Sequence, residues 1–163
     1  MGWDQPGRDA LLRLAISLKL GENHLRDLMD WLEEIALRDQ MKIAEVLARK
    51  SITEVESHPR LGRADKLKRI KEEIRRLRFP RLAQVEDSIR VRIRELKLHP
   101  KIRISVPPGL EGGRLQVEFS ASSADDLLAV IAKLADAAGK DALREIFEFL
   151  GGDRQMERST ASK

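Results

Sequence analysis

The chain has 163 residues, of which 36% are charged and only 4% aromatic, and its formal net charge is +4. No apolar run approaches the roughly 20 residues that cross a bilayer, and the first ten residues do not read as a signal peptide, so we expect no membrane partner. The absence of cysteine excludes disulfides and thiolate metal sites and fits a cytoplasmic location. This composition is typical of a helical protein with an aliphatic core.

Apolar residues at helical spacing predict helices over about 7–20, 23–38 and 40–49, with a short helical turn after Ser51. The sequence HPRLG at 58–62 is a break, and it is expected to close an N-terminal helical domain of residues 1–58. The first two helices invite comparison with a helix-turn-helix motif. The second would present Asp27, Asp30 and Glu33 to phosphates, which favours packing of the two helices into a core instead.

A basic segment follows the break. Between Arg60 and Arg81 there are ten Lys or Arg and three Asp or Glu, so this segment carries +7 and the rest of the chain −3. A basic amphipathic helix is expected over 64–78, and the pair Phe79–Pro80 should interrupt it before a new helix over 80–98. The basic residues are Arg60, Arg63, Lys66, Lys68, Arg69, Lys71, Arg75, Arg76, Arg78 and Arg81.

Three interpretations of this basic segment stay open. The side chains can contact the phosphates of double-stranded DNA in a salt-dependent manner that is largely independent of base sequence, or they can be a solvated face paired with acids of the N-terminal helices. An acidic protein partner is a third use for the same charge. RNA is less favoured, because aromatic residues on which bases could stack are scarce.

The stretch from 101 to 120 alternates with period two, which predicts a β-hairpin with one apolar and one polar face. The apolar positions are Ile102, Ile104, Val106, Leu115, Val117 and Phe119. Prolines and glycines at 107–113 favour a plain reversing turn. Two strands alone are marginal in water, so we expect this face to need a cover and the sheet to be extended by a second copy. The six apolar residues are therefore candidates for homodimerisation.

Helices are expected from Ser123 to Gly139 and over 141–150, with Leu127, Val130, Ile131 and Leu134 of the first facing the core. Residues 59–150 would then form the basic helix and an α-β-β-α dimerisation unit, and 151–163 a disordered tail. The fold class is α+β and predominantly helical. The histidines His24, His58 and His99 show no metal or catalytic spacing, and adjacent acidic pairs diverge on a helix, so no enzyme activity, metal or cofactor is expected.

Four short pieces of the sequence resemble the C-terminal domain of ParB-type chromosome and plasmid partitioning proteins. They are Lys101–Ile104, Gly112–Gly113, Val117–Phe119 and Ser123–Leu128, within a match over about 81–134. The resemblance implies homodimerisation through a merged antiparallel sheet and non-specific DNA binding by a basic surface. The nucleotide-binding N-terminal domain of that family is absent, so a nucleotide switch and a specific centromere site do not carry over. The sequence thus predicts a ParB-like, non-enzymatic, cytoplasmic homodimer that binds DNA.

Overall fold

The computed structural model describes the backbone of residues 3–160 and the side chains of residues 3–151. The chain forms two compact units, Met1–Pro80 and Arg81–Lys163. The fold is α+β and predominantly helical, as the sequence predicts, with a two-stranded antiparallel sheet in the second unit. No helix in the described part of the chain is both long and apolar enough for a membrane span.

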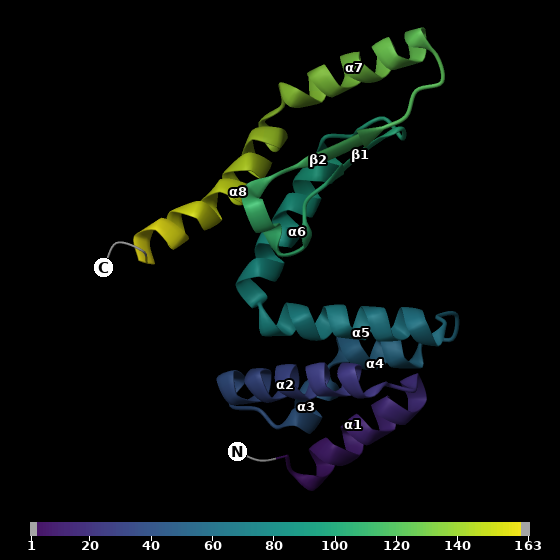
Figure 1. Cartoon of the computed structure of the whole chain (residues 1–163), viewed down its shortest axis with the longest axis vertical. Helices are drawn as coiled ribbons and strands as arrows, with labels where there is room; N and C mark the ends of the chain where they lie inside the picture. The colour runs from purple at the N-terminus through teal and green to yellow at the C-terminus, as the bar shows by residue number, and fades with distance from the viewer. Residues whose placement is uncertain (1–2, 161–163) are drawn as a thin grey trace. The chain divides into compact units, whose positions relative to one another are not determined.

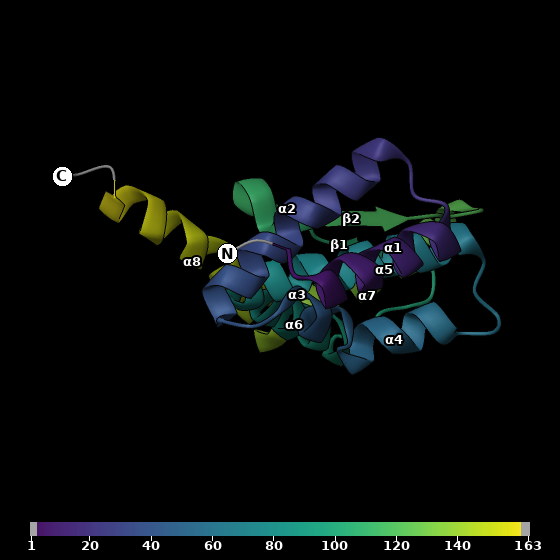
Figure 2. The ribbon, with the colours of Figure 1, turned by 90° about the horizontal axis from the view of Figure 1, so that it is seen from below.

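In the described part of the first unit the regular elements are helices, which are α1 (Gln5–Leu18), α2 (Glu22–Asp39), α3 (Ile43–Leu47), α4 (Lys50–Ser57) and α5 (Arg63–Arg78). α5 packs on α2 and α4, and α1 packs on α3 (Figure 1). Seen from below, α4 lies on the opposite side of α1 from α2 (Figure 2). The core is aliphatic, and Leu28, Leu32, Ile35 and Val46 are completely buried in it.

The basic helix belongs to this first unit. Ile70 and Ile74 of α5 are completely buried in the same core cluster as Leu28 and Leu32. The boundary between the units therefore falls after Pro80, later than the break at 58–62 that the sequence suggested. Gly62 does begin α5, but the apolar stripe of that helix finds its cover among the helices that precede it.

The second unit contains α6 (Pro80–Glu95), β1 (Ile102–Ser105), a short 3₁₀ segment η1 (Pro108–Gly113), β2 (Gln116–Phe119), α7 (Ala124–Ala138) and α8 (Asp141–Thr160). The register pairs Ile102 with Phe119 and Ile104 with Val117. The predicted alternation is confirmed, because these four lie on one face while Arg103 and Glu118 pair on the other. Ile104 joins a core cluster with Ile89 of α6 and Ile146 of α8.

The connection between the strands does more than reverse the chain. Gly109, Gly112 and Gly113 adopt positive φ as expected, and so does Leu110, with φ of 58°. Leu110 is 4% exposed and belongs to the core cluster of the second unit, and η1 packs against α8. A leucine in the left-handed region costs conformational energy, which burial of its side chain offsets. The turn therefore contributes a buried side chain to the core and is not a plain hairpin turn.

The last helix ends later than the sequence suggested. Gly151 was expected to follow its final residue, but the backbone remains helical to Thr160. Glycine in a helix interior costs only about 1 kcal/mol relative to alanine, and no proline lies in this stretch. The predicted disorder of 151–163 stays a prediction, and residues 161–163 lie outside the described part of the chain.

Candidate nucleic-acid interface

The basic residues of α5 are placed by its apolar stripe. Ile70 and Ile74 lie one turn apart and face α2 and α4, with Leu67 and Leu77 packed half-buried beside them. Because side chains three or four residues apart share a helix face, this stripe fixes which cations flank the core and which point to solvent. Two groups of cations on and beside α5 differ accordingly, one that contacts α2 and one that is exposed without a partner, and three further cations have other partners within the chain.

The first group fastens α5 to α2. Lys71 Nζ lies 2.9 Å from Asp27 Oδ2, and Arg78 Nη2 lies 2.6 Å from Glu34 Oε2. Asp27 and Glu34 are two turns apart on α2, so they match two positions two turns apart on α5. The hydrogen bond from Lys71 lowers the pKa of Asp27 below its usual value. Lys71 and Arg78 therefore fit the interpretation in which the basic side chains pair with acids of the N-terminal helices.

Trp31 fills the space between these two ion pairs. Its ring centroid lies 5.2 Å from Lys71 Nζ and 5.9 Å from the Arg78 guanidinium carbon. Both distances fall within the range of a cation–π contact. The same guanidinium lies 4.9 Å from the ring of Phe79. Trp31 therefore contributes to the contact between α2 and α5.

Arg38 is a member of this contact that the sequence did not reveal. Its guanidinium donates to the carbonyl oxygens of Leu77 and Arg78, at 2.7 Å and 2.6 Å. These carbonyls belong to the last turn of α5 and have no intrahelical partner, so Arg38 caps that end. No periodicity links positions about 40 residues apart, which is why the pattern of the sequence carried no signal for this cap.

Three more of the predicted cations have interaction partners within the chain. Lys66 Nζ donates to the backbone oxygen of Glu56 at 2.7 Å, and Arg75 pairs with Glu72 at 2.9 Å. Arg76 also takes part in an interaction within the chain. Arg75 and Arg76 are nevertheless partly exposed, and each lies seven residues, about two turns, after an exposed cation.

The second group consists of Arg60, Arg63, Lys68 and Arg69. All four are exposed, and within the described residues none of their side chains has a hydrogen bond or an ion pair. They lie just before α5 and in its first two turns, and we call them the free cation group. Arg81, the tenth predicted residue, is exposed at the start of α6 and so belongs to the other unit.

The six residues predicted for dimerisation mostly serve the core of their own unit. Ile102 and Ile104 are 6% and 8% exposed, and Val106, Leu115 and Val117 are partly buried against the core cluster. Phe119 is the exception at 46% exposed. The apolar face of the hairpin thus receives the cover that it was expected to need from helices of the same chain.

α7 leaves more apolar surface open than the hairpin does. Leu127, Leu128 and Ile131 are 38%, 65% and 47% exposed, while Val130 is buried. The expectation that Leu127 and Ile131 face the core is therefore wrong, because both side chains are exposed in the single chain. Apolar residues cover about half of the circumference of α7, and the neighbouring core covers a narrower stripe. Two adjacent leucines at 127 and 128 were the sequence signal for that width.

The start of α7 is anchored to β1 by Asp126. Lys101 Nζ lies 2.6 Å from its Oδ2, and the backbone N–H and hydroxyl of Ser122 donate to the same oxygen at 2.8 Å and 3.0 Å. These three donors lower the pKa of Asp126 to about 2, and the hydrogen bond from Lys101 has the largest effect. α7 is therefore fixed at its first turn while its apolar side stays open.

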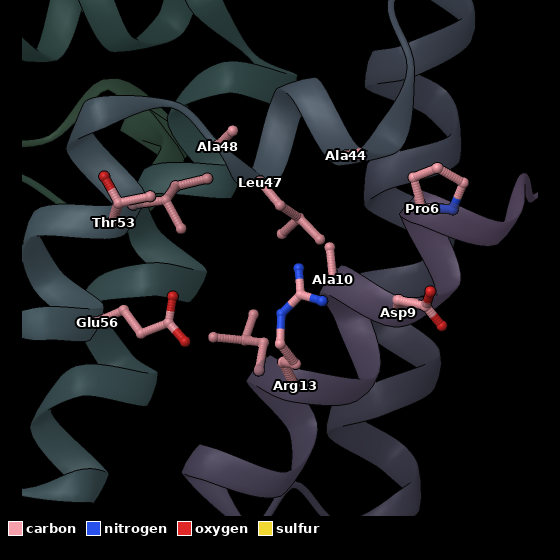
Figure 3. Close-up of a pocket in the computed structure, with 11 residues that line it drawn as sticks. Pro6, Asp9, Ala10, Arg13, Ala44, Leu47, Ala48, Thr53 and Glu56 are labelled. Atoms are coloured by element: carbon pink, nitrogen blue, oxygen red, sulfur yellow. The ribbon is translucent and has the colours of Figure 1, made fainter.

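A pocket of about 570 Å³ between α1, α3 and α4 is a hollow of the first unit with room for a small ligand. Arg13 of α1 and Glu56 of α4 both extend into it, and Ala10 and Leu47 lie beside Arg13 (Figure 3). Its one hydroxyl, on Thr53, is directed to backbone oxygens of α4 and the residue before it. Within the described residues no hydrogen bond joins this hydroxyl to the lining carboxylates of Asp9 and Glu56, so the pocket shows no paired nucleophile and base. Among the described residues no cluster of three or more His, Asp or Glu could hold a metal ion.

Comparison with known proteins found no relative of this chain. No family model, no curated protein and no solved structure matches the chain. A function for this chain is therefore inferred from the geometry of each unit.

Proposed function

We propose that the chain is a non-enzymatic, ParB-like homodimer that binds double-stranded DNA through phosphate contacts of the free cation group. The observation that carries the proposal is the division of the cations on and beside α5. Lys71 and Arg78 have acidic partners on α2, whereas four exposed cations have none within the described residues. Unpaired Lys and Arg gathered in one short segment are suited to displacing counterions from a nucleic-acid backbone.

The aromatic residues support duplex over single-stranded nucleic acid. Trp31 and Phe79 are the aromatic residues near α5, and both are in contact with cations of that helix. Single-strand binders and most sequence-specific RNA binders stack bases on open aromatic faces. Backbone contacts without stacking favour a duplex read by charge rather than by base sequence.

Dimerisation through the second unit is the other half of the proposal. The described sheet has two strands, so each strand has an edge without a partner, and Phe119 lies exposed at one end of it. The open side of α7 adds Leu127, Leu128 and Ile131 to the surface available for a second copy. Two copies would double the number of free cations. A cytoplasmic location, consistent with the lack of cysteine, completes the proposal.

The test is fluorescence anisotropy of a labelled random-sequence duplex across a salt series. If all four free cations contact phosphates, the slope of log K against log salt is about −0.9 for each, or about −3.6 per protomer. Replacing Arg60, Arg63, Lys68 and Arg69 by Gln should weaken binding at least about tenfold at low salt and flatten the slope.

A variant of equal charge is the control. Replacing Arg8, Arg13, Lys19 and Lys42 by Gln removes four cations from α1 and the start of α3, so it lowers the net charge equally. It should retain most of the affinity. Equal weakening by both variants would mean that net charge alone acts, and no binding of the parent chain at low salt would overturn the DNA proposal. In that second case an acidic protein partner becomes the working assignment for the free cation group.

A further inference from the structure

The outer side of α2 carries an apolar groove that the proposed function does not use. Next to the start of α3, a hollow of about 720 Å³ is lined by the apolar side chains of Trp3, Leu37 and Met41. A second hollow of about 460 Å³ lies between α1 and α2, and it is lined by Leu12, Leu25 and Met29 among others. Trp3 lines both hollows, so they adjoin one another along α2, and we call the two together the groove.

The groove has the spacing that an amphipathic helix requires. Leu25, Met29, Glu33 and Leu37 follow one another at four-residue intervals, so they form a row along one side of α2 about 18 Å long. Leu37 is 69% exposed and Met29 36%. Leu12 of α1 is 58% exposed and lines the same groove. An open row of apolar side chains flanked by polar ones is the receiving half of a helix-in-groove contact.

Charge at the groove decides which helix fits. The hollow beside Trp3 is lined by four carboxylates and one lysine, namely Asp4, Asp30, Glu33, Glu34 and Lys42. Glu34 is neutralised by Arg78. Asp4 and Glu33 accept hydrogen bonds from the backbone N–H of Gly7 and from the indole of Trp3, which leave their charge in place. Three carboxylates against one lysine give this part of the groove a negative field.

A second copy of the chain does not match this surface. A two-fold axis through the middle of the row would bring Asp30 and Glu33 close to their own symmetry mates, and like charges across an interface are unfavourable. We therefore propose that the groove docks an amphipathic helix of another protein, with apolar residues four apart and Lys or Arg facing Asp30 and Glu33. This site is independent of the free cation group, so either can fail without the other.

The probe is a synthetic 15-residue helical peptide with three leucines at four-residue spacing and lysines beside them. Its partner peptide carries glutamate in place of each lysine. Trp3 lines the groove, so tryptophan emission reports binding there, and anisotropy of a labelled peptide gives the affinity. The lysine peptide should bind at least about tenfold more tightly than the glutamate peptide.

Variants locate the site. Leu37→Ser and Asp30→Lys should each weaken the lysine peptide about tenfold, and Asp30→Lys should improve binding of the glutamate peptide. The matched controls are Ile16→Ser on α1, where the side chain is 68% exposed and lines neither hollow, and Asp136→Lys on α7, and both should leave the affinities for the two peptides unchanged. Equal affinity for the two peptides, or insensitivity to Leu37→Ser and Asp30→Lys, would overturn the proposal. Self-association that Leu37→Ser abolishes would also overturn it, because a second copy would then occupy the groove.

Discussion

The helices α5 and α7 differ in a way that composition would not suggest. α5 is dense in Lys and Arg, yet Ile70 and Ile74 on its inner side are completely buried. α7 is the more apolar of the two, yet Leu128 is 65% exposed and Ile131 47%. A narrow apolar stripe can be fully covered by two neighbouring helices, whereas a stripe half the circumference wide cannot be covered by one core. Charge content therefore says little about how firmly a helix is packed.

The largest expected effect is on the buried stripe of α5. Ile74→Ala should lower the free energy of unfolding of the first unit by about 2–5 kcal/mol, through lost burial and the cavity left behind. Both tryptophans, Trp3 and Trp31, lie in this unit, so denaturant unfolding followed by their emission reports it alone.

Ile131→Ala on α7 is the matched control for this experiment. The side chain is half-exposed and lies in the other unit, so the same tryptophan transition should move by less than about 0.5 kcal/mol. If both substitutions shifted the transition equally, the two helices would not differ in the way that their burial indicates.

A second, smaller effect concerns the open side of α7. Leu128→Glu places a charge in the centre of the apolar surface that we assign to a second copy, so it should shift sedimentation velocity from dimer to monomer. Ile16→Glu on α1 is a matched comparison, because Ile16 is 68% exposed in the first unit. That variant should keep the mass of the parent chain. A monomeric parent chain, or a dimer that tolerates Leu128→Glu, would remove α7 from the proposed interface.

The sequence predicted what depends on local pattern. The limits of α5 and the inward face of the hairpin follow from the spacing of residues such as Ile70, Ile74, Ile102 and Ile104, because period alone decides which side is apolar. The acidic partners of the Lys and Arg side chains could not be predicted from this spacing. Lys71 meets Asp27 across 44 positions, and this pairing depends on how α2 and α5 pack. The number of Lys and Arg residues in a helix is the same whether those side chains are exposed to solvent or paired with acids of another helix.

The same limit explains the misassigned sides of α7. Periodicity showed that Leu127, Val130 and Ile131 belong to one apolar sector, but the width of the core on which α7 packs is a property of the whole unit. Leu110 shows the opposite case, because a residue inside a glycine-rich turn carries no periodic signal and is nevertheless part of the core. Tertiary packing overrides local pattern at both places.

The smallest expected effect concerns the anchor that holds α7 while its apolar side stays open. The pKa of Asp126 lies at about 2, below its ordinary 3.8, chiefly because of the hydrogen bond from Lys101. A lowered pKa means that the folded state favours the ionised carboxylate, so this contribution to stability is present above pH 3.8 and is lost as the pH falls toward 2. A carboxyl-detected NMR titration should place the midpoint near 2, and Lys101→Met should raise it toward 3.8. A midpoint that Lys101→Met leaves unchanged would show that Ser122 alone holds Asp126, and a midpoint of 3.8 in the parent chain would show that α7 is not anchored to β1 in solution.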